Sequence, residues 1–475
     1  MKNLSAISRE NPAAFSSAHL CFQWFSGARH LMVIFMLVSV LSLSFSSCTR
    51  QPEWEYLFNG EDLSGWIQTG GDAVFEVVDN AIVGTSVANT PNSFLCTVEN
   101  YGDFILEYDF KVDPSLNSGV QIRSLSLPGY MDGRVHGYQV EIDPSERAWT
   151  AGIFDEARRG WLYPLAGSEH ENARQAFRNN EWNNVRVEAI GDHIKTWLNG
   201  VPVTNLYDDE TSEGFIALQV HSIRDSSYEG TRVYWKNIRI ITENPGRYSS
   251  ETTAPEISSL ANKLTEKEVA EGWRLLFDGT TSNGWRGACR DDFPREGWKI
   301  EDGILTVLPT PRGEPVAGGD IVTVETFSDF DLKLQARVTP NANSGVKYFV
   351  REYKTENGCS PLGPEYQVID DNHPNLNEDQ KMGTLYDLME ARNVRLNRVG
   401  QWNNIRIVVR GNLVEHWLNG FKIVEYDRQS DDFDRRVAAS KFKDVEGYGK
   451  IDGHILLQDH RDEVSFRSIR IRTDF

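Results

Sequence analysis

Basic residues are scarce in this chain of 475 residues. Lys and Arg number 49 against 69 Asp and Glu, which gives a formal net charge of −20 at pH 7. A chain with this charge and no basic cluster is repelled by the phosphate backbone of nucleic acids. The sequence therefore predicts no nucleic-acid partner.

Long apolar runs and cysteine motifs are also scarce. Residues 31–45 form the one run that could enter a membrane, which excludes a polytopic membrane protein. None of the five cysteines has the spacing of a zinc site, and no Asp-x-Asp-x-Asp-Gly calcium loop occurs. No cofactor is therefore predicted with certainty, and a divalent metal stays possible.

The N-terminus resembles a bacterial lipoprotein signal. Lys2, Arg9 and Arg29 precede the apolar run, which ends in Ser46-Ser47-Cys48. We expect residues 1–47 to be removed and Cys48 to be lipidated, which anchors the chain in the bacterial cell envelope facing the periplasm. The inner and the outer membrane both stay open, as do an ordinary cleaved signal and an N-terminal anchor helix.

An oxidising periplasm bears on the remaining cysteines. It would permit a disulfide between Cys289 and Cys359, because both lie in the second half, and would leave Cys96 unpaired. Three buried thiols are the alternative.

The second half of the chain repeats the first in order. Five pairs of short blocks match: 56–66 with 275–285, 117–120 with 343–346, 138–140 with 366–368, 181–186 with 401–406, and 197–200 with 417–420. Two later pairs, 214–221 with 453–460 and 233–240 with 464–471, complete the repeat. We therefore expect a first domain over 48–244, a linker with a short helix over 245–271, and a second domain over 272–475.

The pattern within each copy is that of an antiparallel sandwich. Aromatic residues make up 11% of the chain, and residues 104–112, 184–189 and 231–240 alternate apolar with polar side chains. Asn-Gly turns at 199–200 and 419–420 predict hairpins. The best helix candidate is 257–270. Many short strands without a βαβ rhythm predict an all-β fold of two tandem jelly-roll β-sandwiches.

The repeated blocks resemble one known family. The series Phe-[Asn/Asp]-Gly…Gly-Trp, Asn-Ser-Gly-Val, Tyr-Gln-Val…Asp, Trp-Asn-Asn, Trp-Leu-Asn-Gly and Leu-Gln-x-His is similar to the 3-keto-disaccharide hydrolase domain, formerly a domain of unknown function. This resemblance implies a concanavalin-A-like jelly roll, an oligosaccharide or glycoside substrate oxidised at sugar C3, and a sugar 3-dehydrogenase upstream in the pathway.

Cleavage of such a substrate needs few groups. A ketone at C3 acidifies the C2 proton, so a base can remove it, the C1 substituent can leave, and water can then add to the enone. A carboxylate or His base, an acid for the leaving oxygen, and hydrogen-bond donors or a metal at the enolate oxygen would suffice.

The second copy supplies one candidate set. Glu365 and Gln367 share a strand face in Glu365-Tyr-Gln-Val-Ile-Asp370, and we predict Glu365 or His460 as base or acid. The predicted substrate-binding residues of this copy are Arg351, Gln367, Asp370, Tyr386, Asp387 and Gln458.

The first copy departs from this set, because Gly137 stands at the sequence position of Glu365. Glu141 and His221 are its predicted catalytic residues. Its predicted substrate-binding residues are Arg123, Gln139, Asp143, Trp149 and Gln219, with Trp161 and Tyr163 as further stacking rings. Trp182 and Trp197 are expected in the core.

Two other functions stay open. Glu141-Ile-Asp-Pro-Ser-Glu146 resembles the strand of retaining endo-glucanases, in which two glutamates face the cleft, although Pro144 favours an earlier strand end. The chain could also be a tandem carbohydrate-binding lipoprotein without catalysis, since fold does not fix function. A convergent carboxylate, His and Arg would favour the enzyme.

Overall fold

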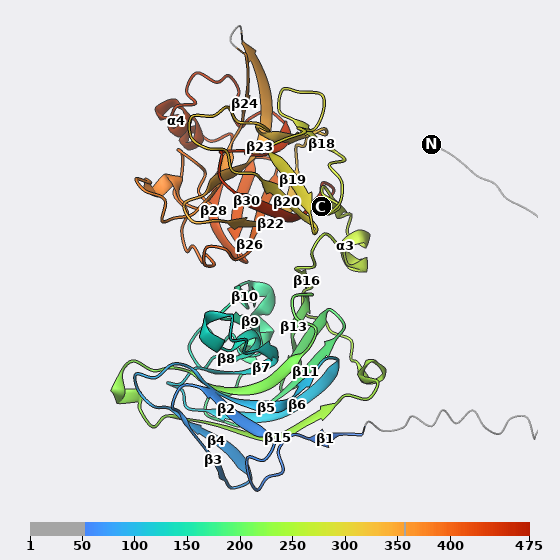
Figure 1. Ribbon diagram of the computed structural model, residues 1–475, viewed down its shortest axis with the longest axis vertical. Coiled ribbons are helices and arrows are strands. Elements are labelled where there is room, and N and C mark those ends of the chain that lie inside the picture. Colours follow the sequence, from blue (N-terminus) through green and yellow to red (C-terminus); the bar gives the residue numbers. More distant parts are fainter. Residues whose placement is uncertain (1–52, 356–357) are drawn as a thin grey trace, which may run out of the picture. The chain divides into compact units, whose positions relative to one another are not determined.

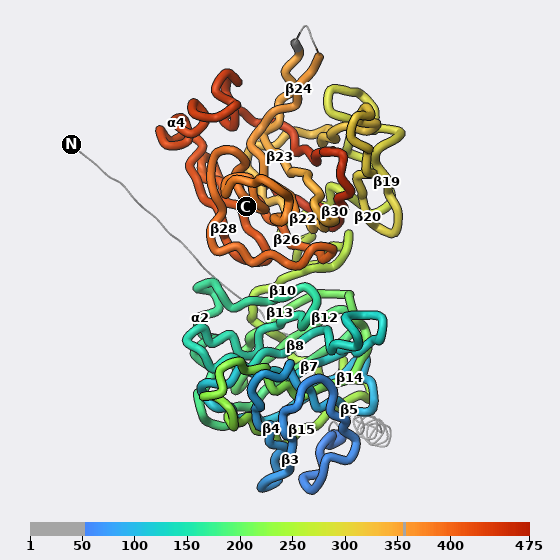
Figure 2. The backbone as a smooth tube through the Cα atoms, turned by 60° about the vertical axis from the view of Figure 1, so that its left-hand side comes forward, coloured from blue at the N-terminus to red at the C-terminus, as the bar shows by residue number. Residues whose placement is uncertain are grey.

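The computed structural model describes residues 53–355 and 358–475 (Figure 1). The predicted signal and Cys48 lie outside these residues. Figure 2 traces the chain from blue to red, and the two halves do not interleave: blue to green segments form the first copy, and yellow to red segments form the second. The described residues contain no helix long and apolar enough to cross a membrane.

The first copy is a sandwich of two sheets within the described residues. One sheet has the order β16 (Ile257–Ser258), β13 (Val201–Tyr207), β12 (His193–Leu198), β11 (Asn183–Ile190), β6 (Phe104–Val112), β15 (Arg232–Ile241), β4 (Ala81–Thr85), β3 (Val74–Val78), with β1 (Glu55–Tyr56) on β15. The facing sheet has the order β10 (Gly160–Tyr163), β9 (Ile153–Glu156), β8 (His136–Ile142), β7 (Ser118–Leu125), β14 (Gly214–Val220), β5 (Ser93–Tyr101), β2 (Trp66–Gly70).

The second copy repeats this plan in the part of the chain that is described. One sheet has the order β19 (Trp298–Glu301), β20 (Ile304–Val307), β30 (Val464–Arg472), β22 (Phe330–Val338), β26 (Asn403–Arg410), β27 (Leu413–Leu418), β28 (Phe421–Asp427), with β17 (Arg274–Leu275) on β30. The other has β18 (Trp285–Gly287), β21 (Ile321–Thr323), β29 (His454–Leu457), β23 (Asn343–Thr355) and β24 (Gly358–Leu362), with β25 (Glu365–Ile369) on β23.

Helical segments are short. Within residues 53–355 and 358–475 they are the α-helices α2 (Glu171–Gln175), α3 (Glu266–Ala270) and α4 (Asp431–Ala439), and the 3-10 turns Met131–Gly133, Ser168–His170, Ser226–Tyr228, Pro245–Tyr248 and Glu378–Gln380. Strands far outnumber helical residues in the described part of the chain, and they pair almost entirely antiparallel, which confirms the predicted all-β sandwiches.

The alternating sequences form the predicted strands. β6 spans Phe104–Val112, and every second residue from Phe104 to Val112 points into the first core. Both predicted Asn-Gly hairpins are confirmed, because Asn199 and Gly200, like Asn419 and Gly420, adopt the positive φ that a type I′ turn requires.

The linker helix is much shorter than predicted. Of residues 257–270, only Glu266–Ala270 are helical, and Ile257–Ser258 instead pair in parallel with β13. Thr265 begins the helix with a capping box, in which its hydroxyl accepts from the Glu268 N–H and Glu268 accepts from the Thr265 N–H. The apolar pattern of 257–260 therefore serves a sheet edge and not a helix face.

Each copy has its own apolar core between its two sheets. Trp235, Tyr108 and Phe110 are fully buried in the first core, and Phe330, Tyr348 and Tyr366 in the second. Trp197 is buried but does not join the first core: it alternates with the core residues Ile194 and Leu198, and the Lys195 ammonium lies 5.5 Å from its ring centroid. The prediction for Trp182 is wrong, because this ring is 37% exposed and carries the Lys236 ammonium 4.0 Å from its centroid.

Candidate active sites

Strand alternation decides which polar side chains leave the core. On β8, Tyr138 and Val140 pack in the first core, so Gln139 and Glu141 point to the outer face of the sheet. On β25, Tyr366 and Val368 pack in the second core, so Glu365 and Gln367 point outward. These outer faces carry the candidate sites, called here site 1 on β7 and β8 and site 2 on β23 and β25.

Site 1 is built around the Glu141 carboxylate, and the Arg147 guanidinium lies 3.8 Å from Glu141 Oε1. The Asn117 Nδ2 donates to Glu141 Oε1 over 2.8 Å, and the Gln139 Nε2 donates to Glu141 Oε2 over 2.7 Å. Gln121 Nε2 in turn donates to Gln139 Oε1 over 2.6 Å. Burial raises the pKa of Glu141 to about 7 against these hydrogen bonds, so the group can accept and return a proton near neutral pH.

Site 2 contains an ammonium group between two carboxylates. Lys347 Nζ lies 3.8 Å from Asp320 Oδ2 and 3.9 Å from Glu365 Oε2, and we call these three residues the site 2 triad. Burial raises the pKa of both Glu365 and Asp320, and the Lys347 charge opposes the shift in each. The triad therefore offers two carboxylates able to exchange protons beside a fixed cation.

The glycine of the Asn-Ser-Gly-Val blocks makes room for these groups. A Cβ on Gly119 would lie 2.5 Å from the Gln139 side chain, and a Cβ on Gly345 would lie 2.2 Å from Glu365 Oε1. The preceding serines, Ser118 and Ser344, each donate to the backbone oxygen of the late-strand glutamine over 2.7 Å. The Asn-Ser-Gly-Val block thus provides the backbone against which the side chains of each site pack.

Strand register changes how the copies correspond. Gly119 pairs with Glu141, whereas Gly345 pairs with Gln367. In the next outward-facing row, Gln121 pairs with Gln139, and Lys347 pairs with Glu365. The structural counterpart of Glu365 is therefore Gln139 and not Gly137, which corrects the alignment based on Tyr-Gln-Val.

The two sites thus exchange the places of an amide and a carboxylate. Site 1 has the amide of Gln139 and then the carboxylate of Glu141, and site 2 has the carboxylate of Glu365 and then the amide of Gln367. The Gln367 amide fits its surroundings when its nitrogen, and not its oxygen, faces Glu365. In that orientation the nitrogen donates to Glu365 Oε1 and to Ser344 O, each over 3.1 Å. In each copy the glutamine therefore holds a carboxylate two residues away on the same strand face.

Sequence reasoning missed the residues that surround the two carboxylates. Lys347 and Gln121 each lie two residues after the motif glycine, on the same strand face, and that spacing could have identified them. Asp320 directly precedes β21 and comes close only through sheet pairing, so no local pattern marks it.

Arg123 does not bind substrate in site 1. Its side chain is 1% exposed, and its guanidinium donates to Gly102 O, Gly191 O and Asp103. This arginine therefore joins loops at one end of the sandwich. Arg351 is exposed and alternates with Glu352, which pairs with Arg286, so the cation beside Glu365 is Lys347 and not Arg351.

The predicted aspartates serve turns. Asp143 accepts from the Ser145 and Trp149 N–H groups and from Arg147 Nε, the last over 2.7 Å. Asp370 accepts from the Asn341 and Asn372 N–H groups. Both side chains are nearly fully buried, and their oxygens hold the loops that follow β8 and β25.

The endo-glucanase strand is not formed. β8 ends at Ile142, and Glu146 lies exposed in the turn that follows Pro144. The two glutamates therefore do not share a strand face, and this prediction is wrong.

The aromatic residues of site 1 divide into two groups. Trp149 and Trp161 meet edge to face with centroids 4.8 Å apart, and the Arg147 guanidinium lies 4.6 Å from the Trp149 ring. Trp161 is half-buried and so could still stack on a sugar. Tyr163 is fully buried and donates to Pro255 O, so it is not a stacking ring.

The late-strand residues lie near the sites. Gln219 follows the core residue Leu218, so it faces site 1. His221 is half-buried, and its Nδ1 contacts Ser222 O over 2.8 Å. His460 is exposed and close enough to Asp320 to oppose the rise of its pKa. The catalytic roles assigned to both histidines, and the binding role of half-buried Gln458, stay predictions.

Tyr386 and Asp387 border site 2. The Tyr386 N–H donates to Glu365 O over 3.0 Å, and Lys441 Nζ lies 4.3 Å from the Tyr386 ring. Asp387 accepts from the Lys441 N–H. Among the described residues, no group of three or more His, Cys, Asp or Glu is arranged as a metal-ligand set.

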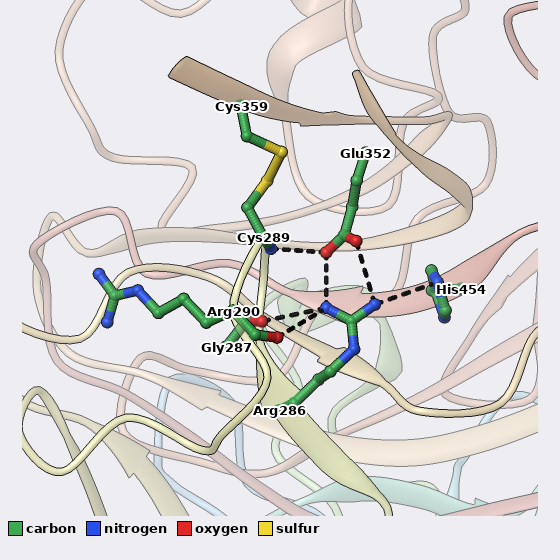
Figure 3. The surroundings of a disulfide bond; sticks show 7 residues. All are labelled: Arg286, Gly287, Cys289, Arg290, Glu352, Cys359 and His454. Carbon is green, nitrogen blue, oxygen red and sulfur yellow. Dashed lines mark hydrogen bonds and ion pairs between the residues drawn. A yellow bond between two sulfur atoms is a disulfide. The ribbon is translucent and has the colours of Figure 1, made fainter. Parts of the chain in front are cut away.

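The disulfide lies at the edge of the second copy's site-bearing sheet (Figure 3). Cys289 is bonded to Cys359 of β24, which resolves the sequence alternatives in favour of the disulfide, and Cys96 is a buried free thiol. Glu352 accepts from the Cys289 N–H over 2.5 Å and from Arg286 Nη1 over 2.7 Å. Arg286 also reaches His454 Nε2 over 3.3 Å, so this cluster fastens the loop to the sheet.

Comparison with known proteins agrees with this architecture. A family model of the 3-keto-alpha-glucoside-1,2-lyase-like domain matches residues 53–241 and again 272–472. A 3-keto-disaccharide hydrolase of Bacteroides thetaiotaomicron is 32% identical over 251 residues, which are 47% of this chain and 85% of that protein.

Solved structures also match single copies. A glycosyl hydrolase candidate of Parabacteroides distasonis is 32% identical, with a TM-score of 0.42, over 46% of this chain and all of the other. The carbohydrate binding module CBM66 of Bacillus subtilis is 18% identical, with a TM-score of 0.27, over 39% of this chain and 99% of the other.

These findings define the protein as a carbohydrate-cleaving hydrolase of β-sandwich fold. The chain belongs to the family of the 3-keto-alpha-glucoside-1,2-lyase-like domain, which it contains twice.

Proposed function

We propose that site 2 cleaves 3-keto-glycosides by elimination across C1 and C2. The observation that carries this proposal is the site 2 triad, in which Lys347 lies within 4 Å of two buried carboxylates of raised pKa. Removal of a proton next to a ketone needs a base of raised pKa and a cation or hydrogen-bond donor at the enolate oxygen. The triad holds both, together with a second carboxylate for the leaving group.

Each group has a stated task. The Glu365 carboxylate takes the C2 proton, and the electrons of that bond form an enolate whose oxygen faces the Lys347 ammonium. As the C3 ketone re-forms, the C1–C2 double bond forms and the C1–O bond breaks. Asp320, in its protonated form, gives its proton to the leaving oxygen. The products are an enone and the free alcohol, and the addition of water to the enone completes a net hydrolysis.

The substrate class rests on the relatives. The Bacteroides thetaiotaomicron protein is named for 3-keto-disaccharides, and the family description names 3-keto-alpha-glucosides. An oxidation at C3 must supply such a substrate, so a sugar 3-dehydrogenase is the expected upstream partner. A lipid anchor at Cys48 in the cell envelope belongs to the same proposal.

The test compares a 3-keto-glycoside with its unoxidised parent. We expect the mature chain to release the alcohol from the keto sugar only, and Glu365→Gln to lower the rate at least 100-fold. Glu301→Gln changes an exposed glutamate of the same copy and should leave the rate unchanged. Equal release from both sugars, or full activity of Glu365→Gln, would contradict the proposal.

A binding function for the first copy is the second candidate. Half-buried Trp161 stands beside Phe154 of β9, with ring centroids 5.3 Å apart. Such rings stack on sugar faces. Saturable binding of unoxidised glycans, with no release of alcohol from either sugar, would favour a tandem carbohydrate-binding protein over the enzyme.

A further inference from the structure

A polar side chain crosses the core of the second copy toward site 2. His416 of β27 alternates with the core residues Val414 and Leu418, so its ring points into the core, where it is fully buried. Its Nδ1 lies 3.0 Å from the backbone oxygen of Gly383, which belongs to the segment that pairs with β25 of the other sheet. A buried imidazole is costly unless its nitrogens are hydrogen-bonded, and here both are.

The partners of this imidazole fix where its protons lie. Gly383 O can only accept, so Nδ1 carries a proton and donates to it. Burial lowers the pKa of His416 to about 4, which keeps the ring neutral near neutral pH, and Nε2 therefore accepts from the Tyr348 hydroxyl over 2.8 Å. The Tyr348 oxygen in turn accepts from the Tyr426 hydroxyl over 2.8 Å. The two tyrosines thus hold the ring while its Nδ1–H is directed at one backbone carbonyl.

That carbonyl belongs to the backbone partner of the strand that carries the proposed base. The Gly383 N–H donates to Gln367 O over 2.9 Å, and the Gln367 N–H donates to Thr384 O over 3.2 Å. The side-chain nitrogen of Gln367 donates to Glu365 Oε1 over 3.1 Å in the orientation that fits its surroundings. A shift of Gly383 therefore moves the amide that holds the Glu365 carboxylate.

The first copy makes the same connection with two threonines. Thr196 and Thr204 oppose each other on β12 and β13 immediately before a register shift, which is the place that His416 has on β27. Both hydroxyls donate to Ala151 O, over 2.6 and 2.9 Å. The Ala151 N–H in turn donates to Glu141 O over 2.8 Å. In both copies, a donor from one sheet thus reaches the backbone partner of a site residue in the other sheet.

The two carbonyls are equivalent in place and in conformation. Their residues pair with Glu141 and Gln367, which occupy the same row opposite the motif glycine. Ala151 has a φ of 66° and Gly383 a φ of 85°, and this left-handed backbone is unfavourable for alanine. The copies therefore share this conformation and a donor that crosses the core to it, although the donor itself differs. The contact follows the site and not the packing of one core.

We infer that His416 is a positioning residue of site 2, which aims the Glu365 carboxylate at the C2 proton by holding Gly383 from inside the core. The inference rests on the proposed function of site 2. His416 lies in the core, whereas Glu365 faces the outer side of the sheet, so the histidine acts through Gly383 and Gln367 and not on the substrate. Without the Nδ1–H, the buried Gly383 carbonyl would lose its donor, and the segment beside β25 would shift to find another.

Two substitutions separate the donor from the volume of the ring. His416→Asn places an amide nitrogen near the position of Nδ1, because both atoms are bonded to Cγ, and His416→Leu fills the space without a donor. We expect His416→Leu to lower kcat for alcohol release from a 3-keto-glycoside at least about 10-fold and to change KM less than about 2-fold, because a misplaced base costs rate and not binding. His416→Asn should keep kcat within about 3-fold of the unaltered protein.

Leu305→Ala is the control for a loss of stability alone. Leu305 is buried in the same core on β20, which β30, β22 and β26 separate from β27. This variant should lower the urea midpoint, as His416→Leu does, and keep the unaltered kcat. An unaltered kcat in His416→Leu, or an equal loss of kcat in folded Leu305→Ala, would overturn the inference. A kcat of His416→Asn as low as that of His416→Leu would show that the donor is not what matters, and would overturn it too.

Amide hydrogen exchange of the full mature chain gives a measurement that does not depend on catalysis. The segment 365–369 should exchange about 10-fold faster in His416→Leu than in the unaltered protein, and His416→Asn should restore the slow rate. If the unaltered protein releases no alcohol, the proposed function of site 2 fails, and exchange alone decides whether His416 holds this strand. Unchanged exchange in His416→Leu would refute that role.

Discussion

Lys347 should set the pH at which site 2 becomes active. Its ammonium lies 3.9 Å from Glu365 Oε2 and lowers the pKa of that carboxyl against the effect of burial. Lys347→Met keeps the apolar stem and removes the charge. The pKa of Glu365 should then rise, so the base stays protonated to a higher pH and the acid limb of the rate profile moves upward.

The size of the shift follows from the distance. At an effective dielectric constant of about 20, two unit charges 3.9 Å apart interact by about 4 kcal/mol. Solvent reaches both side chains slightly and weakens this interaction, and the Lys441 charge, which also lowers the pKa of Glu365, stays in the variant. We therefore expect the acid limb to move upward by only part of this energy.

The assay is the pH dependence of kcat/KM for alcohol release from a 3-keto-glycoside. Lys354→Met, which changes an exposed lysine on the same strand, is the control and should keep the original profile. An acid limb that does not move in Lys347→Met would show that this lysine does not act on the catalytic base.

Three further predictions concern glycine, burial and the disulfide. Gly345→Ala should abolish alcohol release, because the new Cβ would lie 2.2 Å from Glu365 Oε1. Alcohol release by this variant at the rate of the unaltered protein would refute the packing argument. The pKa of Glu141 rises from 4.5 to about 7, so the carboxylate costs stability as pH rises through that window. Urea unfolding should therefore show Glu141→Gln gaining about 3 kcal/mol more at pH 8 than at pH 4, and a pH-independent effect would contradict the shift. The double variant Cys289→Ser, Cys359→Ser opens a link between residues 70 apart and should lower the unfolding free energy of the second copy by about 4 kcal/mol, where no change in the urea midpoint would refute the estimate.

The sequence predicted the fold well because its signals are local. The alternation of apolar and polar residues predicted both ends of β6, and the Asn-Gly pairs predicted both hairpins, because each signal depends on a few neighbouring residues. The linker helix failed because an apolar pattern over 257–260 suits a sheet edge as well as a helix face.

The sites could be predicted only in part. Glu141, Glu365 and their glutamines follow from strand alternation, which is local. Asp320 directly precedes β21 and Lys347 lies on β23, and β29 separates these two strands in the sheet. The two copies also differ by two residues in strand register, which depends on pairing and cannot be read from the sequence of either strand alone. Arg123 was misassigned because nothing in the sequence shows that its guanidinium turns toward the loops at Gly102 and Gly191.

The fate of the C2 hydrogen tests the central claim most directly. A 3-keto-glycoside carrying deuterium at C2 is incubated with the protein, and any released 3-keto sugar is examined by mass spectrometry, with an enzyme-free sample as the reference for spontaneous exchange. Elimination predicts that deuterium is replaced by hydrogen from solvent in step with alcohol release, with a primary isotope effect. Release of the alcohol with deuterium fully retained at C2 would show direct displacement at C1 and contradict the account.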